Sequence, residues 1–395
     1  MATTAAPTAT AAPTRTDWRK EWFEIEDAVY LNTAMQSAMP KVAIRAVQEA
    51  LEQKKFPQRM SEMAHYEIPK RVRAQVASLI GAQAEDIALT TGASSGMATV
   101  AYSLAWRPGD EIVTGAGEFP LQYSTWRPME EREGAKLKIV KASGKFITAD
   151  DLLGALTDRT RIVSVSMVRF DDGSRMDTQK LGAACHECGV LLLLDASQCC
   201  GATAIDVATL GADFVTSAAY KWLLGPYGTG FFWANPKITQ TLRPGPYYWQ
   251  GIAGIDDRHT SGLNMSDARP ARGSRRWDAA ETASYLNLAA LEASVKLVTE
   301  MGVETVAEHN RGLIEYMYER LPKDRCVPSS PLDAAQRGPY GCFAGRTREK
   351  TAEMHAQLTK ERVMVSLREG NIRVSPHMFN TESDIDRLVS VVTTL

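Results

Sequence analysis

The chain has 395 residues and a formal net charge of −2, with 44% hydrophobic and 23% charged residues. This length suits two domains, or one large domain with a smaller satellite, and the composition is that of a globular protein. The balanced charge argues against nucleic acid as the main partner, because binding phosphates needs an excess of Lys and Arg. No apolar run reaches the roughly 20 residues of a membrane-spanning helix, so a membrane-spanning chain is excluded.

The six cysteines do not form a disulfide framework in a chain of this length. They indicate a reducing compartment, and we expect a cytoplasmic protein. Cys185 and Cys188 have the spacing of a zinc or redox pair, but no second such pair and no pair of histidines accompanies them. They fall on one turn of a predicted helix that ends at Gly189. Buried thiols are therefore the favoured interpretation, and we predict no metal site.

Short apolar runs alternate with helical patterns along the chain after a tail over residues 1–16. That tail is rich in Ala, Thr and Pro and has little to bury, so it is predicted to be disordered. Helices are predicted over 42–52, 71–79 and 97–105. Strands are predicted over 87–90, 111–114, 137–140, 161–167, 190–194 and 214–218. Because strands separated by helices are joined by crossover connections, this order predicts a mostly parallel sheet with helices on both faces. A last run over 231–233 follows a Gly-rich turn and is a candidate for an antiparallel strand.

The alternation breaks over residues 243–276, which are rich first in Pro, Gly and aromatic residues and then in charges. A long helix is predicted over 280–301. The remainder mixes short strands with helices over 351–359 and 384–395. We therefore predict a large domain over 17–270 and a smaller C-terminal α+β domain over 271–395, to which the N-terminal segment also contributes.

Three motifs follow predicted strands, where ligands bind in open α/β sheets. The first is the small-residue segment Thr91–Gly96 between a strand and a helix. Its glycines allow close approach of a ligand, and the free N–H groups of a helix N-terminus attract phosphate. A tight turn that only connects the two elements is the alternative interpretation.

The second and third motifs each end an apolar strand with a charged residue. Asp195 follows four leucines, and a buried Asp needs a partner. A protonated heterocyclic nitrogen, a metal or the following turn are alternative partners. Lys221 lies between Tyr220 and Trp222, ahead of a Gly-rich turn. Burial lowers the pKa of a lysine and gives a nucleophilic amine near neutral pH, whereas a lone lysine at a strand end is usually solvated.

Together these motifs are what a site for pyridoxal 5′-phosphate (PLP) requires. With Gln198, they resemble the class V aminotransferase family of fold-type I PLP enzymes, over residues 25–395. That family includes cysteine desulfurases, C–S lyases, kynureninases and isopenicillin N epimerase-like proteins. The resemblance implies an α/β fold with a mostly parallel seven-stranded sheet, bound PLP and a homodimer.

The resemblance also implies roles for individual residues. Lys221 forms the Schiff base with PLP, and Asp195 pairs with the protonated ring nitrogen. Gln198 bonds to the ring hydroxyl. Ala93 and Ser94 match the pair that binds the phosphate.

Further residues match family positions around the cofactor and the substrate. Tyr220 replaces the usual His before the lysine and is a possible phosphate donor. Phe119 matches the residue that stacks on the ring, and it has no group that can act as an acid; an ordinary core residue is the alternative. Arg373, in the segment Gly370–Thr381, matches the arginine that binds the substrate carboxylate in a bidentate fork.

Several departures from the family bear on the reaction. Cysteine desulfurases carry a mobile loop with a Cys before the carboxylate arginine, whereas residues 365–370 are short and lack Cys. Cys342 falls in a strand-like segment and is expected to be buried. Phe170 replaces the family's Asn after the middle strand. The turn by which a neighbouring subunit reaches the phosphate is replaced by residues 280–283, where Thr282 is a possible substitute.

We therefore expect an enzyme that acts at the α-carbon of an amino acid, with the amine of Lys221 as the base. A C–S lyase-like β-elimination is favoured, with an aminotransferase or an epimerase as the alternative. A catalytically silent binding protein is a further alternative, but such a protein would have no reason to retain Asp195, Gln198 and Lys221 together.

The side-chain pocket is less well defined by the sequence. Arg169, Trp126, Tyr248 and Trp249 are candidates to line it. An aromatic lining of this kind would favour a bulky or cationic substrate through stacking and cation–π contacts.

Overall fold

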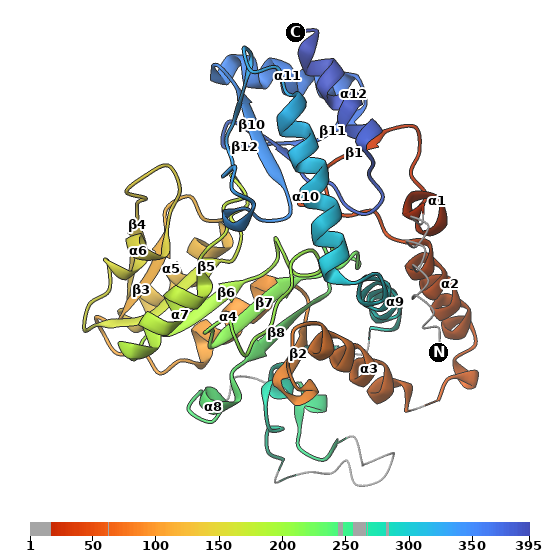
Figure 1. Ribbon diagram of the computed structural model, residues 1–395. Coiled ribbons are helices and arrows are strands. Elements are labelled where there is room, and N and C mark those ends of the chain that lie inside the picture. Colours follow the sequence, from red (N-terminus) through yellow and green to blue (C-terminus); the bar gives the residue numbers. More distant parts are fainter. Residues whose placement is uncertain (1–16, 62, 244–247, 256–265, 267, 282–283) are drawn as a thin grey trace, which may run out of the picture.

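The computed structural model describes residues 17–395 except 62, 244–247, 256–265, 267 and 282–283 (Figure 1). The predicted tail over residues 1–16 and the candidate Thr282 lie outside the described residues. Within the part of the chain that is described, no helix is both long and apolar enough to cross a membrane.

Seven of the described strands form one large sheet in the order β2-β8-β7-β6-β5-β3-β4. They are β2 (Ile87–Thr90), β3 (Glu111–Gly115), β4 (Lys136–Val140), β5 (Thr160–Ser166), β6 (Leu191–Asp195), β7 (Phe214–Ala218) and β8 (Gly230–Ala234). Strand β8 is antiparallel to both neighbours, and the other neighbouring pairs are parallel. The predicted mostly parallel sheet and the antiparallel strand at 231–233 are confirmed.

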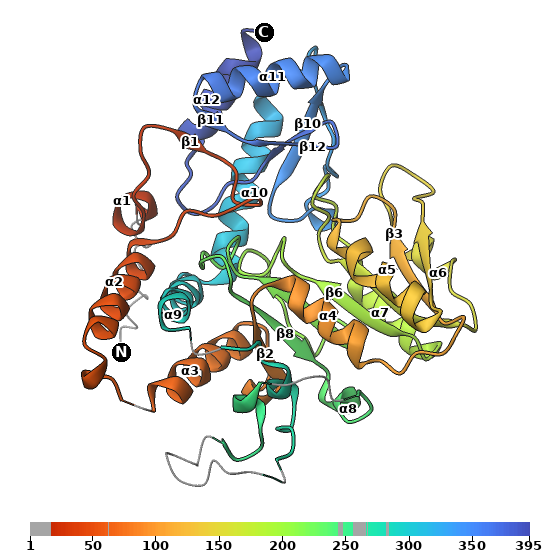
Figure 2. The same cartoon turned by 180° about the vertical axis from the view of Figure 1, so that it is seen from behind.

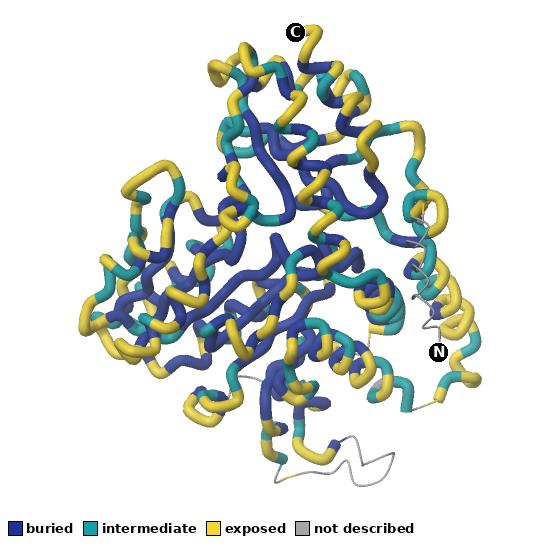
Figure 3. The backbone as a smooth tube through the Cα atoms, viewed as in Figure 1, coloured by how far each residue is buried: buried dark blue, intermediate teal, exposed yellow. Residues whose placement is uncertain are grey.

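Helices cover both faces of this sheet, as Figures 1 and 2 show from opposite sides. They include α4 (Ala93–Ser103), α5 (Leu121–Glu133), α6 (Ala149–Leu153) and α7 (Thr178–Glu187). Successive strand residues point to opposite faces. Ile162 and Leu193 accordingly share an apolar cluster with α4 and α5, while Val163 and Leu192 share another with α7. Apart from the edge strand β4, the strands are buried on both faces (Figure 3), which explains their largely apolar sequences.

A second, antiparallel sheet lies in the C-terminal part of the chain, in the order β12-β13-β10-β9. Its strands are β9 (Cys326–Pro328), β10 (Gly341–Gly345), β12 (Ser366–Arg368) and β13 (Asn371–Val374). The N-terminal segment joins this part, because β1 (Val29–Tyr30) pairs in parallel with β11 (Val363–Met364). An ion pair of 3.0 Å between Arg19 and Asp384 adds a second link.

The other described helices connect and cover these sheets. They are α1 (Trp18–Trp22), α2 (Lys41–Lys55), α3 (Ala64–Leu79), α8 (Pro236–Thr239), α9 (Tyr285–Met301), α10 (Val303–Arg320), α11 (Arg348–Lys360) and α12 (Glu382–Thr393). Helix α9 packs against α2 and α3 and leads into α10, which runs up to the second sheet (Figure 1).

Some helices begin at residues other than those predicted. Helix α3 starts at Ala64 rather than 71 and includes Pro69, a residue that disfavours helix interiors because it lacks an N–H. Helix α4 starts at Ala93 rather than 97, although Ser and Gly in its first turn are weak helix formers. The long helix predicted from 280 starts at Tyr285.

Candidate active site

A cavity of about 350 Å³ lies where β2, β6 and β7 end at the edge of the large sheet. It is lined by seven of the eight predicted site residues, namely Ala93, Ser94, Phe119, Asp195, Gln198, Tyr220 and Lys221. This is the edge of a parallel sheet at which ligands bind, and the volume lies in the range of small-molecule sites. Hollows of about 800 and 720 Å³ lie elsewhere, but none of these seven residues lines them. The site is therefore identified by the predicted residues that meet in this cavity, and not by the size of the cavity.

The N-terminus of α4 faces the cavity at Gly92, Ala93 and Ser94. Gly92 has a φ of 151°, which favours glycine, and no side chain caps the first turn of the helix. The first N–H groups of a helix have no partner within the helix, and the helix dipole makes this end positive. The turn can therefore hold a phosphate.

Asp195 ends β6 and is 7% exposed. Its Oδ1 accepts a hydrogen bond of 2.9 Å from the Ser197 N–H. Among the described residues no cation forms an ion pair with it, although it lines the cavity. A buried carboxylate needs a partner, and a protonated ring nitrogen bound in the cavity fits this one.

Lys221 follows β7 and is 8% exposed. Its Nζ lies 5.7 Å from the centre of the Phe119 ring and 5.5 Å from that of Tyr220. The pKa of Lys221 is lowered from 10.5 to about 8, chiefly by burial; the charge of Asp195 opposes this shift, and those of Arg373 and Arg368 add to it. The amine is thus available as a nucleophile and a base near neutral pH.

Gln198 lines the cavity while both ends of its amide contact protein. Its Nε2 donates to the Ala34 carbonyl at 3.1 Å, and its Oε1 accepts from the indole N–H of Trp222 at 3.4 Å. The backbone N–H of Ser37 also donates to the Tyr220 carbonyl at 3.0 Å. Residues 34–37 carry no recognisable motif in the sequence, but these contacts join them to the site.

Aromatic rings form the walls of the cavity. Tyr220 stacks on Tyr227 with ring centres 3.8 Å apart, and burial raises the pKa of Tyr220 to about 12. It therefore remains a neutral donor. Phe119 is 43% exposed and meets Phe170 edge to face at 5.3 Å, so it has the exposure that stacking on a bound ring requires.

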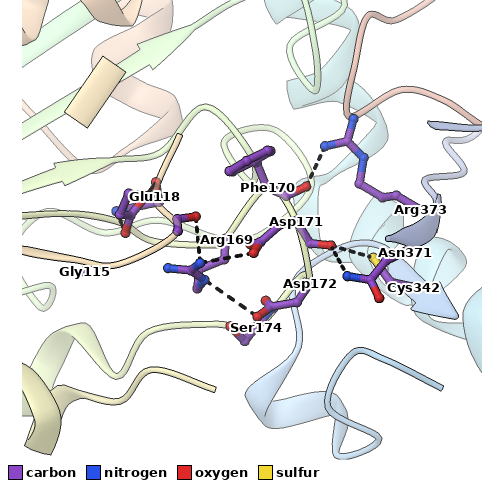
Figure 4. A network of polar contacts seen from close by, with 12 residues as sticks. Gly115, Glu118, Arg169, Phe170, Asp171, Asp172, Ser174, Cys342, Asn371 and Arg373 are labelled. Atoms are coloured by element: carbon purple, nitrogen blue, oxygen red, sulfur yellow. Dashed lines mark hydrogen bonds and ion pairs between the residues drawn. The ribbon is translucent and has the colours of Figure 1, made fainter. Parts of the chain in front are cut away.

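Arg373 is the one predicted site residue that does not line the cavity. It is 1% exposed, and its Nη1 donates to the Phe170 carbonyl at 2.7 Å, as Figure 4 shows. Its Nε is buried without a partner among the described residues. Since Phe170 lines the cavity, the guanidinium lies directly behind the cavity wall.

The segment before Arg373 is a two-residue hairpin. Strands β12 and β13 pair Arg368 with Asn371, and the turn residues Glu369 and Gly370 have φ of 48° and 84°. Positive φ at both central residues is typical of a type I′ turn, which closes two strands tightly. No loop is present at the position where desulfurases of the family carry their cysteine.

Cys342 is buried, as its strand-like sequence predicted. That thiol is fully buried and donates to the Asp171 carbonyl at 3.6 Å, and burial raises its pKa to about 12. A thiol with such a pKa has almost no thiolate at neutral pH and is a poor nucleophile. None of the six cysteines lines the described cavity.

None of the four candidates for the side-chain pocket lines the described cavity. Trp126 is fully buried in α5 and packs against Trp106 in the core, where its size stabilises the helix–sheet interface. Trp249 packs against Tyr248, whose hydroxyl bonds to Glu281. The fourth candidate, Arg169, has its guanidinium buried beneath the loop that follows β5.

Comparison with known proteins agrees with this geometry. The family model of the class-V aminotransferases matches residues 29–388, and the chain belongs to that family. A probable cysteine desulfurase from Methanothermobacter thermautotrophicus is 24% identical, with 94% of this chain and 96% of that protein aligned.

Solved structures show the same fold. A variant of the protein C-DES with glycine covalently linked to its PLP cofactor superimposes with a TM-score of 0.84 and 21% identity, over 96% of this chain and 99% of that one. The complex of C-DES, a cystine C–S lyase, with its product cysteine persulfide has a TM-score of 0.82 and 21% identity, over 93% and 97% of the two chains. The predicted fold-type I architecture is confirmed.

Proposed function

We propose that this class-V aminotransferase family member is a PLP-dependent enzyme that cleaves a C–S bond of an amino acid by β-elimination. The observation that carries the proposal is the meeting of three groups in one cavity: an uncapped helix N-terminus, the buried Asp195 without a cation partner and the buried amine of Lys221. These are the groups that PLP needs at its phosphate, its ring nitrogen and its aldehyde.

The residues present fit PLP in detail. We assign the phosphate to the N–H groups at Ala93 and Ser94, with the neutral hydroxyl of Tyr220 as a further donor. Phe119 would cover one face of the ring, and Gln198 would bond to the ring hydroxyl. When bound, PLP supplies an electron sink for the bonds at the substrate's α-carbon.

Lys221 would attach the cofactor and then carry the proton. With a pKa of about 8, its Nζ is unprotonated in about a tenth of the molecules at pH 7, and it can accept the α-proton of the substrate. Burial keeps water from the amine, and Asp195 stays close enough to stabilise the protonated form. Arg373 would bind the substrate carboxylate in a bidentate fork.

The tight hairpin at Glu369 and Gly370 favours elimination over sulfur transfer to the protein. A desulfurase needs a thiolate within reach of the substrate sulfur. The hairpin leaves no loop that could bring one, and Cys342 is buried with a raised pKa. Sulfur would therefore leave as a thiol or persulfide product.

The first test concerns the cofactor. Protein purified with PLP should be yellow, and borohydride should fix PLP to Lys221, as peptide mass spectrometry can establish. Lys221→Ala should bind PLP without a covalent bond and lose turnover. A colourless protein after PLP is added, or a label on another residue, would refute the proposal.

The second test concerns the reaction. S-substituted cysteines and other amino acids should be screened for pyruvate, keto-acid and ammonia release. Pyruvate without an added keto acid supports elimination. Dependence on a keto-acid acceptor would indicate an aminotransferase, and inversion alone would indicate an epimerase. A protein that binds PLP and turns over none of them would be the silent binding protein.

We also propose a cytoplasmic homodimer, with a large domain over 17–270 and a small one over 271–395. All six cysteines are free, which supports a reducing compartment. Tyr227 is 57% exposed beside the cavity, and aromatic side chains are enriched at protein interfaces. Light scattering of the purified protein tests the dimer.

A further inference from the structure

The loop that follows β5 links the large sheet to the strand that carries Arg373. The Phe170 carbonyl accepts from Arg373 Nη1 at 2.7 Å, and the next carbonyl, of Asp171, accepts from Asn371 Nδ2 at 3.3 Å (Figure 4). Arg373 and Asn371 are two residues apart on β13, so their side chains lie on the same face of the second sheet. Two successive carbonyls of one loop therefore fix the face of β13 that points to the site.

The side chain of Arg169 holds this loop from the other side. Its Nη2 donates to the Gly117 carbonyl at 2.7 Å and to Asp171 Oδ2 at 3.1 Å, and its Nε lies 3.6 Å from Asp172 Oδ2. Gly117 follows β3, at the cavity edge of the large sheet. Its φ is +72°, and a Cβ there would lie 2.6 Å from Arg169 Nη2, so glycine is required for the close approach.

The charges make Arg169 necessary to the loop. The side chains of Asp171 and Asp172 are 14% and 15% exposed, and that of Arg169 is 7% exposed between them. The buried carboxylate of Glu118 also interacts electrostatically with this arginine. Without the guanidinium, neighbouring buried carboxylates would repel each other, and leaving a buried charge unpaired is strongly destabilising. The loop would have to move, and the Phe170 carbonyl would move with it.

We propose that Arg169 is a positioning residue for substrate binding: it clamps the loop after β5 so that the Phe170 carbonyl holds Arg373 in place for the substrate carboxylate. This inference rests on the proposed function, because it assumes an amino-acid substrate. The Arg169 side chain does not line the cavity, and it is linked to Arg373 through the backbone of the loop, where Arg373 bonds to the Phe170 carbonyl.

An arginine suits this task better than a lysine. The guanidinium serves a carbonyl and two carboxylates at once because its donors point in fixed, separate directions. A lysine would keep the charge but could not hold all three groups in this geometry. Arg169→Lys should therefore retain the fold and lose part of the positioning.

The test compares ligands with and without a carboxylate, using the PLP-loaded protein. Dissociation constants for L-alanine and L-alaninamide are measured from the change in cofactor absorbance. Arg169→Gln should raise the constant for L-alanine at least tenfold and that for L-alaninamide less than threefold, with Arg169→Lys in between. Arg159→Gln, which removes a surface arginine paired with Glu111, is the matched control and should change neither.

A double variant shows whether the effect passes through Arg373. In an Arg373→Gln background, Arg169→Gln should cause no further loss of L-alanine affinity, because the group that it positions is gone. Equal losses for both ligands, or additive losses in the double variant, would refute the inference. Asp172→Asn removes one ion pair of the loop while the guanidinium of Arg169 stays in place. It should raise the dissociation constant for L-alanine at least threefold and leave that for L-alaninamide unchanged.

The two proposals can fail separately. The borohydride label on Lys221 tests the PLP site without any reference to Arg169. A protein that carries this label and binds both ligands, but shows no difference between the acid and the amide on Arg169→Gln, refutes the role of Arg169 and leaves the proposed function intact.

Discussion

Replacing Lys221 with Met should stabilise the cofactor-free protein at pH 7. Burial lowers the pKa of Lys221 from 10.5 to about 8, so folding makes the charged amine less favourable. At roughly 1.4 kcal/mol per pKa unit, this cost is about 3 kcal/mol at pH 7. Met has a similar length and no charge, so it removes the cost while filling most of the space.

The sign of the pH dependence follows from the same shift. Below pH 8 the amine is protonated in both the folded and the unfolded chain, and the full cost applies. Between pH 8 and 10.5 the unfolded chain binds more protons, so the wild type gains stability as the pH rises. The advantage of Lys221→Met should therefore be largest at pH 7 and vanish near pH 10.5.

Urea unfolding of the PLP-free protein, followed by circular dichroism at several pH values, measures this difference. Lys180→Met is the matched control, because Lys180 is 49% exposed and pairs with Asp150 on the surface. It should change stability by less than about 1 kcal/mol at each pH. A Lys221→Met variant that is no more stable than the wild type at pH 7, or whose advantage is the same at pH 7 and 10, would refute the reasoning.

Three further predictions concern the chemistry. Asp195→Ala should lower turnover at least a hundredfold while the urea midpoint changes little, because within the described part of the chain its carboxylate accepts a single hydrogen bond, from the Ser197 N–H; near-normal turnover would mean a structural role. Cys342→Ser should keep turnover within about twofold, and mass spectrometry of the wild type after incubation with cysteine should detect no persulfide; a persulfide on Cys342 would reverse the choice of elimination. Tyr220→Phe should weaken PLP binding severalfold in a spectroscopic titration, and unchanged affinity would exclude its hydroxyl from the phosphate site.

The large sheet was predictable because its strands, apart from the edge strand β4, are buried on both faces. Runs such as Leu191–Leu194 and Phe214–Ala218 are apolar throughout, which is the pattern of a parallel sheet between two helix layers. The first residues of the helices were harder to predict, because packing in the folded chain outweighs the low helix propensity of individual residues. Pro69 inside α3 and the small residues at the start of α4 are poor helix formers that packing and the site nevertheless hold in helices.

Seven of the eight predicted site residues line one cavity because each follows the end of an element at the same sheet edge. Side-chain partners could not be predicted in this way. Arg169 stands next to the lining residue Phe170 in the sequence, but its guanidinium pairs with Asp171 and Asp172 and does not line the cavity. The run Arg169–Asp172 was a signal for such a clamp, since a buried cation beside two acids pairs with them first.

The hairpin before Arg373 links the two proposals physically. With two residues in the turn, β12 and β13 are held in fixed register, and Asn371 and Arg373 present one face to the loop after β5. A long cysteine-bearing loop at this position would let the start of β13 move, and its contact with the Asp171 carbonyl would be lost in part of the population. A short turn brings no protein thiol to accept sulfur, and it holds β13, and with it Arg373, in a fixed position. A short turn therefore suits an enzyme that releases its sulfur product into solution. It does not suit one that must hold the sulfur on a cysteine of its own.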